Sequence, residues 1–163
     1  MAIRFYRSRG EYGPLSNFSR HSFELDGFQW PTVEHYFQAQ KFPTTDLFER
    51  IRHASTPLEA KKLGQTRSVP LRPDWDEVKD EVMRRAIRRK FETHPDLRNL
   101  LLSTGDEELV EDSPSDYYWG CGANGSGKNM TGILLMEVRS VLRVSGKQLT
   151  IGWVKCPKNR EGQ

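Results

Sequence analysis

The hydrophobic and polar positions of this chain follow two periods, one typical of strands and one typical of helices. Short apolar runs at residues 3–6, 22–25 and 28–30 predict strands, and the Asp26-Gly27 pair between the last two predicts a hairpin turn. A last strand is expected at residues 149–154. Elsewhere apolar residues recur at helical spacing and prolines mark the breaks, which predicts helices over residues 33–42, 45–54, 57–64, 74–92, 95–102 and 130–143.

These elements indicate one α+β domain over residues 1–163, mainly helical with a small β-sheet. We expect residues 156–163 to form a flexible tail. The chain is 36% hydrophobic and 29% charged, as soluble globular proteins are. It has no apolar run long enough to cross a membrane, and its first residues lack the apolar core of a signal peptide, so we expect a cytoplasmic protein without a membrane partner.

The predicted helix at residues 33–42 is apolar over most of its circumference but carries a narrow polar stripe. At about 100° per residue, Glu34, Gln38 and Lys41 fall within roughly 60° of one another. A carboxylate, an amide and an amine on an otherwise apolar helix either face water through a gap or line a cleft. Glu34 has a second interpretation, because an acidic residue also stabilises the N-terminus of a helix.

A second unusual segment is the glycine-rich loop at residues 116–132, with an apolar helix behind it. Such a loop is expected to bring backbone N–H groups to the helix N-terminus, which makes an anion site. Gly122 to Lys128 match the phosphate-loop pattern, but Asn129 stands where that pattern needs Ser or Thr. A nucleotide triphosphatase is therefore disfavoured, and a purely structural loop with a helix cap stays open.

Together with other segments, these two stretches resemble the NADAR, or YbiA-like, N-glycosidases. The resemblance implies the YbiA-like fold and hydrolysis of an N-glycosidic bond. It implies two substrate types, namely phosphorylated ribosylaminopyrimidines of riboflavin biosynthesis, which yield ribose 5-phosphate and a free aminopyrimidine, and ADP-ribose attached to guanine in nucleic acid. The matching segments run along almost the whole chain, at residues 12–18, 30–42, 60–64, 75–79, 90–91, 100–106, 109–111 and 119–139.

Cleavage of a bond between ribose C1 and nitrogen passes through an oxocarbenium-like state, so the site needs a carboxylate near the sugar and a way to activate water. Glu34 is the first candidate for that carboxylate, and Asp116 is the second, with a turn after Pro114 as the alternative role of Asp116. Lys41 allows a different mechanism, in which a neutral amine attacks C1 and forms an imine. Its simpler role is to bind phosphate or sugar.

The remaining candidates are substrate-binding residues. Trp119 offers a flat surface for a heterocycle, Asn17 lies in a loop where it can hydrogen-bond the sugar, and Gln38 belongs to the polar stripe. At the helix entry, Gly127, Lys128 and Asn129 are expected to take the phosphate. The expected partner is thus a small phosphorylated N-glycoside, and ADP-ribosylated nucleic acid is a further possibility.

Several other classes of function are disfavoured. Two cysteines and four histidines lie scattered without ligand spacing, so we expect no metal site and no cofactor. The basic run at residues 84–90 follows acidic residues on the same predicted helix, which complements the helix dipole better than it suggests a DNA-binding surface. A non-catalytic module that binds NAD-derived or ADP-ribosylated ligands remains an alternative, and a nucleic-acid-binding domain is a weaker one. The sequence leaves the oligomeric state open.

Overall fold

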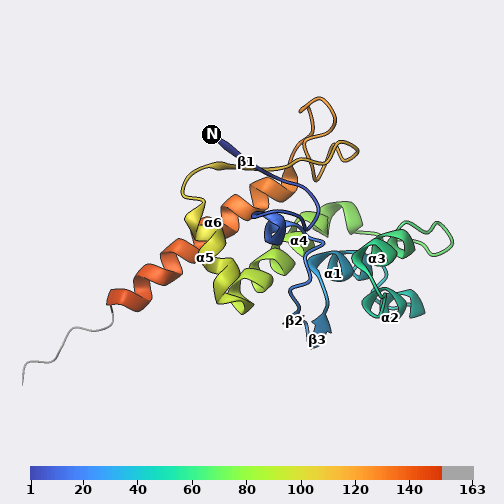
Figure 1. Ribbon diagram of the computed structural model, residues 1–163. Helices are drawn as coiled ribbons and strands as arrows, with labels where there is room; N and C mark the ends of the chain where they lie inside the picture. Colours follow the sequence, from blue (N-terminus) through green and yellow to red (C-terminus); the bar gives the residue numbers. More distant parts are fainter. Residues whose placement is uncertain (152–163) are drawn as a thin grey trace, which may run out of the picture.

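The computed structural model describes the main chain over residues 1–151 and the side chains as far as residue 146. Within that range the molecule is mainly helical, and Figure 1 shows short strands in the upper part of the view and below the helices. The α+β architecture predicted from the sequence is therefore confirmed. In chain order the elements are β1 (Ala2–Phe5), the 3-10 helix η1 (Gly13–Leu15), β2 (Phe23–Leu25), β3 (Phe28–Trp30), α1 (Val33–Ala39), α2 (Asp46–Arg52), α3 (Pro57–Gly64), α4 (Trp75–Thr93), α5 (Pro95–Ser103), β4 (Glu108–Glu111) and α6 (Met130–Ile151).

The strands form two separate two-stranded ladders within the described range. The predicted hairpin is present, since β2 and β3 pair antiparallel around Asp26 and Gly27. Both turn residues have positive φ angles, 54° and 81°, as a two-residue hairpin loop of this kind requires. The second ladder was not predicted: β1 pairs in parallel with β4, a strand more than a hundred residues later in the chain.

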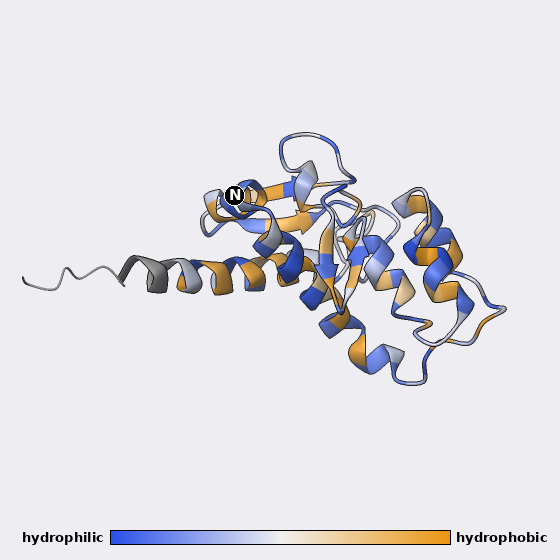
Figure 2. Ribbon diagram, turned by 90° about the horizontal axis from the view of Figure 1, so that it is seen from below, coloured by the Kyte–Doolittle hydropathy of each residue, from blue (hydrophilic) through white to orange (hydrophobic). Residues whose placement is uncertain are grey.

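The core forms where α4 packs against α1, α5, α6 and β2. The helices carry both hydrophobic and hydrophilic residues along their length (Figure 2), as helices with one face in a core do. Full burial of one large apolar side chain stabilises a fold by about 1.5–3 kcal/mol. The largest fully buried apolar side chains come from several elements and include Phe23, Trp30, Tyr36, Phe42, Met83, Ile87, Phe91 and Leu101.

Helix α1 begins where the sequence predicts and ends three residues earlier than expected. The Thr32 side chain accepts a hydrogen bond from the His35 N–H and so caps its first turn. After Ala39 the chain tightens, because Lys41 and Phe42 donate their N–H groups to carbonyls only three residues back. Pro43 follows, and the residue before a proline avoids the α-helical region.

The C-terminal helix corrects another expectation. The strand predicted over residues 149–154 is wrong for residues 149–151, which continue α6. Residues 152–154 and the expected tail at 156–163 lie outside the described residues. No helix in the described part of the chain is long and apolar enough to cross a lipid bilayer.

The basic run on α4 is mostly engaged in contacts within the protein. Lys90 differs from its neighbours because its side chain is buried and its Nζ donates to the Pro14 and Ser16 carbonyls and to Ser19 Oγ, which anchors the loop before Asn17 to α4. The other members pair as follows: Arg84 with Glu81 and Glu137, Arg85 with Asp26, Arg88 with Glu92, and Arg89 with the Glu24 carbonyl.

Candidate active site

The polar stripe of α1 is buried in the protein rather than exposed to water. Glu34 and Gln38 are 6% and 4% exposed, and the Gln38 amide Nε2 donates to Glu34 Oε1 over 2.7 Å. The amide oxygen of Gln38 is buried and has no hydrogen-bond partner within the described part of the chain. A buried polar atom of this kind costs about 1–3 kcal/mol, and in a native protein it calls for a ligand or a water.

Asn17 lies directly against the start of α1. Its backbone carbonyl accepts the Glu34 N–H over 3.1 Å, and its side chain is 5% exposed. The side-chain oxygen of Asn17 is also buried, with no partner among the residues that the structure describes. Asn17 and Gln38 therefore each hydrogen-bond Glu34, Asn17 at its backbone N–H and Gln38 at its carboxylate. Each of them also has a buried side-chain oxygen without a partner among the described residues.

Lys41 lies past the end of α1 and is partly buried. Its Nζ is 3.4 Å from the Gly64 carbonyl oxygen, and it lies 5.5 Å from the ring centroid of Phe37 and 5.8 Å from that of Trp75. Burial lowers the pKa of Lys41, Glu34 acts in the opposite direction, and Lys61 lowers it further. Lys41 thus belongs to the same electrostatic environment as Glu34.

Helix α3 approaches α1 closely at Gly64. A Cβ atom at this position would overlap the side-chain amide of Gln38, so only glycine fits. The close approach brings the cationic side chain of Lys61, on the same helix, into the site. Lys61 Nζ lies 5.9 Å from the ring centroid of Phe18, and its charge lowers the pKa of Glu34.

Three carboxylates affect one another in this region. Burial raises the pKa of Glu34, an effect opposed by the Gln38 hydrogen bond and by Lys61 and Lys41, and Asp116 raises it further. Burial also raises the pKa of Glu111, to about 7, and the negative charges of Asp116 and Glu34 add to this effect. Glu34, Glu111 and Asp116 therefore form one electrostatic cluster.

Asp116 has the turn role that was its alternative interpretation. Its Oδ1 accepts hydrogen bonds from the backbone N–H groups of Tyr118 and Trp119, over 3.0 and 2.7 Å. These bonds fold the start of the glycine-rich loop. Its charge nevertheless reaches Glu34 and Glu111, so the turn also places a negative charge beside the other two carboxylates.

The glycine-rich loop is closed by its own backbone. The N–H groups of residues 127–131 all donate to carbonyls of residues 117–121, over 2.8 to 3.1 Å. At Gly127 a Cβ atom would collide with the Gly120 carbonyl, so this glycine is required for packing of the loop on itself. The expected cradle of free N–H groups is therefore wrong for residues 127–131, because these donors are already used.

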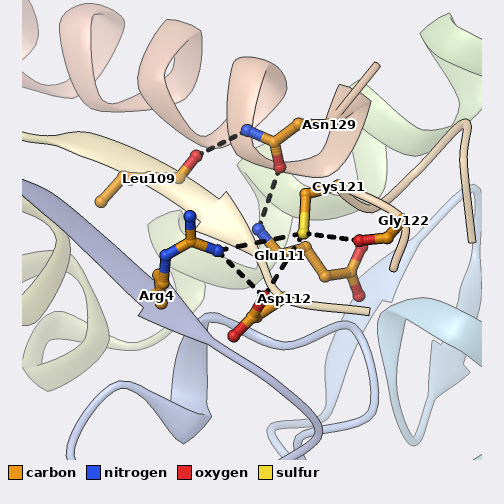
Figure 3. Close-up of polar contacts among 7 residues, drawn as sticks. All are labelled: Arg4, Leu109, Glu111, Asp112, Cys121, Gly122 and Asn129. Atoms are coloured by element: carbon orange, nitrogen blue, oxygen red, sulfur yellow. Dashed lines mark hydrogen bonds and ion pairs between the residues drawn. The ribbon is translucent and has the colours of Figure 1, made fainter. Parts of the chain in front are cut away.

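Asn129 joins this loop to the β1–β4 ladder (Figure 3). Its Nδ2 donates to the Leu109 carbonyl over 2.8 Å, and its Oδ1 accepts the Glu111 N–H over 2.9 Å. The φ angle of Asn129 is 52°, in the left-handed region that asparagine tolerates better than most residues. Both polar groups of its side chain thus hold β4, whereas the sequence suggested a phosphate contact.

Cys121 lies near Glu111, buried beside an exposed ion pair (Figure 3). Its Sγ contacts Asp112 Oδ1 at 3.3 Å, and Arg4 Nη1 donates to the same carboxylate oxygen over 2.9 Å. Its backbone N–H donates to the Glu111 carbonyl over 2.9 Å. The cysteine and Asn129 together hold the main-chain carbonyl and the N–H group of Glu111.

A row of aromatic rings leads from Lys41 to Lys128. Trp119 is half-buried and packs edge-on against Phe37 at 5.1 Å and against Tyr118 at 5.0 Å between ring centroids. The side chain of Lys128 is exposed, and its Nζ lies 5.0 Å from the centroid of the Tyr118 ring. Of the three residues expected to take a phosphate, Lys128 is the one with an exposed cationic side chain.

Sequence reasoning missed Glu111 and Lys61 as site residues. Lys61 was one of two lysines on the predicted helix at residues 57–64, and Glu111 was one acid after a short apolar pair. Their position becomes apparent only when β4 pairs with β1 and α3 packs on α1. The one local signal was the glycine at position 64, which indicates a close helix approach.

Two surface hollows exist apart from this cluster. One is lined by residues of α2, α3 and the loop after α3, including Arg50, Lys62 and Thr66. The other is lined by residues that include Phe18, Arg20 and His21. Neither lining includes the clustered carboxylates or Lys41. Within the described residues, no group of three or more His, Cys, Asp or Glu side chains is arranged to hold a metal ion.

The NADAR domain family model matches residues 4–143 of this chain. N-glycosidase YbiA of Shigella flexneri is 51% identical over 142 residues, which cover 87% of this chain and 89% of that protein. An N-glycosidase of Nostoc punctiforme is 49% identical over 146 residues, covering 88% of this chain and 94% of its own length.

Two further relatives connect the chain to a larger protein and to a solved structure. The chloroplastic riboflavin biosynthesis protein PYRR of Zea mays is 45% identical over 153 residues, which cover 85% of this chain and 25% of that protein. The NMR structure of the Escherichia coli protein YbiA aligns with a TM-score of 0.84 and 48% identity, covering 90% of this chain and 88% of that one. By sequence and by structure, the chain belongs to the NADAR family.

Proposed function

We propose that this chain hydrolyses the bond between ribose C1 and nitrogen in a phosphorylated ribosylaminopyrimidine, releasing ribose 5-phosphate and a free aminopyrimidine. The reaction class is that of an N-glycosidase, as relatives about half identical over nearly nine tenths of the chain are named. The choice of substrate draws on the relative named as a riboflavin biosynthesis protein, which contains a matching region. The substrate and the roles of individual residues are the proposal.

The observation that carries the proposal is the buried group around Glu34. A carboxylate on an apolar helix is accompanied by two unpartnered amide oxygens, on Gln38 and Asn17. Such oxygens accept hydrogen bonds, and the hydroxyl groups of a ribose donate them. A purely structural carboxylate would not need two vacant acceptors beside it, whereas a sugar site would.

In the proposed mechanism, Glu34 acts on the sugar. Its negative charge stabilises the positive charge that develops at C1, and its oxygen takes a proton from the attacking water. Burial raises the pKa of Glu34, and Lys61 and Lys41 oppose this effect and so favour the ionised form that the role requires. Lys41 also has an alternative role as an amine nucleophile, and burial lowers its pKa in the direction that this route needs.

The aminopyrimidine is assigned to the aromatic row and the phosphate to lysine side chains. Stacking of a base on an aromatic ring contributes about 1–3 kcal/mol, and Trp119 is the half-buried ring of the row. Lys128 and Lys41 lie at opposite ends of this row, each over an aromatic ring. Either lysine provides a charge-assisted contact to a phosphate oxygen.

The test is the release of ribose 5-phosphate by the purified protein from a ribosylaminopyrimidine 5-phosphate, followed by mass spectrometry. A second reaction contains an oligonucleotide with ADP-ribose on guanine, and a third contains free NAD as a control for general glycohydrolase activity. We expect release from the small molecule alone. Release only from the oligonucleotide would move the substrate to ADP-ribosylated nucleic acid, and binding of either ligand without turnover would make the chain a binding module.

A further inference from the structure

We propose that Glu111 is the group that protonates the leaving nitrogen in this reaction. The inference rests on the N-glycosidase function proposed above and adds a second acid–base residue to it. A nitrogen leaving group departs poorly as an anion, so cleavage of the bond is accelerated by an acid that delivers a proton to it. Glu34, which takes a proton in the same reaction, cannot supply that proton in the same step.

The geometry of Glu111 suits a fixed acid. Its main chain is held by Asn129, which accepts its N–H, and by Cys121, which donates to its carbonyl. The carboxyl Oε2 is buried without a hydrogen bond of ordinary geometry among the described residues, and the Thr131 hydroxyl acts on the same carboxyl group. Figure 3 shows the Asn129 contact that holds its main chain. A carboxyl group held by its backbone in a buried position can donate a proton to a ligand that takes the place of the Thr131 hydroxyl.

The polar and charged groups that act on Glu111 come from several elements. Glu34 on α1 and Asp116 in the loop are negative, Lys61 on α3 is positive, and Thr131 on α6 contributes a hydroxyl. On the neighbouring strand, Arg4 is paired with Asp112. Burial and the two carboxylates together outweigh the lysine and the hydroxyl, and the pKa of Glu111 is raised to about 7.

Burial raises the pKa of both Glu34 and Glu111, but their polar contacts differ. Glu34 receives an amide hydrogen bond and the fields of two lysines, which oppose the effect of burial, while Asp116 adds to it. Glu111 faces two negative carboxylates, which add to the effect of burial, and a lysine and the Thr131 hydroxyl, which oppose it. Two neighbouring carboxyl groups with unlike polar contacts are a common arrangement for acid–base catalysis.

The step balances as follows. The Glu111 carboxyl group gives its proton to the glycosidic nitrogen as the bond between C1 and nitrogen breaks with both electrons on nitrogen. Water forms the new bond to C1 and loses one proton to the Glu34 carboxylate. The products are ribose 5-phosphate and the neutral aminopyrimidine. The proton on Glu34 then returns to Glu111 through water, and one water molecule has been consumed.

The leaving group tests this assignment directly. Wild type and Glu111→Gln are compared on a ribosylaminopyrimidine 5-phosphate and on p-nitrophenyl riboside 5-phosphate, whose phenolate leaves without a proton. We expect Glu111→Gln to lose about 10²- to 10⁴-fold in kcat on the aminopyrimidine substrate and less than threefold on the nitrophenyl substrate. Glu108→Gln, an exposed acid on the same strand, is the matched control and should behave as wild type on both.

A uniform loss on both substrates, or no loss on either, would overturn the assignment of Glu111 while leaving the proposed function intact. A wild-type protein that cleaves neither substrate would overturn the proposed function and this inference with it. The activity of the wild-type protein therefore distinguishes a failure of the Glu111 assignment from a failure of the proposed function.

The wild-type pH profile provides a test that needs no variant, in case Glu111→Gln does not fold. The acid acts while protonated, so kcat/KM for the aminopyrimidine substrate should fall as pH rises through about 7. The nitrophenyl substrate should not show this fall. The same decrease with both substrates, or with neither, would contradict the role of Glu111.

Discussion

The polar stripe of α1 and the glycine-rich loop were both predicted to contact substrate, yet they satisfy their polar groups in opposite ways. On α1 and beside it, the Gln38 and Asn17 side-chain oxygens are buried and find no partner in residues 1–146, whose side chains the structure describes. In the loop, the N–H groups of residues 127–131 all have carbonyl partners, and the Asn129 side chain uses both its polar groups. The first region leaves buried side-chain acceptors without donors, whereas the main-chain donors of residues 127–131 in the second are all used.

This difference distinguishes a region that can bind a ligand from a region that supports the fold. A buried acceptor without a donor costs free energy, and a ligand that supplies the donor recovers it. Main-chain donors that are already used, as those of residues 127–131 are, gain nothing from an anion, but they hold fixed the segment to which they are bonded. In this molecule the loop holds β4 and hence Glu111, while α1 presents Glu34. The following variants test that division, beginning with the largest expected effect.

Glu34→Gln should lower kcat for ribose 5-phosphate release by about 10²- to 10⁴-fold, because the amide keeps the shape of the side chain and loses its charge. The dissociation constant of the product, measured by calorimetry, should change less than threefold. Glu108→Gln again provides a matched exposed control.

A Glu34→Gln variant that retains most of its kcat would show that the buried acid of α1 is a helix-end charge. In that case the contrast between the two regions would concern stability alone, and the chemistry would have to be assigned to Lys41 or Asp116.

Substitutions in the glycine-rich loop should change the stability of the protein rather than its catalytic rate. Asn129→Ala removes both side-chain hydrogen bonds and leaves the Glu111 N–H and the Leu109 carbonyl unpaired, so we expect a loss of about 2–4 kcal/mol in the free energy of unfolding. Urea denaturation followed by circular dichroism measures it. Asn124→Ala, in the exposed part of the same loop, is the control. An Asn129→Ala protein of normal stability that binds phosphate poorly would return Asn129 to the substrate.

The sequence predicted the local features of this fold well and the long-range ones poorly. The hairpin around Asp26 and the cap at Thr32 depend on residues within a few positions, so their signals lie in the sequence itself. The pairing of β1 with β4 joins segments a hundred residues apart, and β4 is a four-residue strand with an acid at each end. Nothing local distinguishes such a strand from a loop.

The candidate site shows the same difference between local and long-range features. Glu34 was found from helical spacing alone, because its helix is otherwise apolar. Glu111 and Lys61 reach the cluster only through the packing of β4, α6 and α3, which the spacing of apolar residues does not encode. The glycines suggested an anion site, but only the structure shows that Gly127 is needed for steric reasons and that its N–H is already bonded.

Lys128 tests whether the loop contributes any binding through a side chain. Lys128→Gln should weaken binding of ribose 5-phosphate by about tenfold, as loss of one charge-assisted contact does, and leave ribose itself unaffected. Lys79 is a suitable comparison because its Nζ also lies over the Tyr118 ring, at 4.4 Å, while it pairs with Asp76. Equal weakening by Lys79→Gln would mean that the effect is a general one of surface charge.

The smallest effect is expected at Lys41, and it decides between the two mechanisms. If Lys41 binds phosphate or sugar, Lys41→Arg keeps the positive charge and should change kcat/KM by only a few-fold. Borohydride added during turnover should then leave no sugar on the protein. If the amine instead attacks C1, arginine cannot replace it, because its guanidinium stays protonated, and turnover should disappear. An adduct mapped to Lys41 by mass spectrometry, absent from Lys41→Arg, would make Lys41 the nucleophile. Glu34 would then assist the attack of the amine rather than that of water, and the reaction would still take place at the polar stripe of α1.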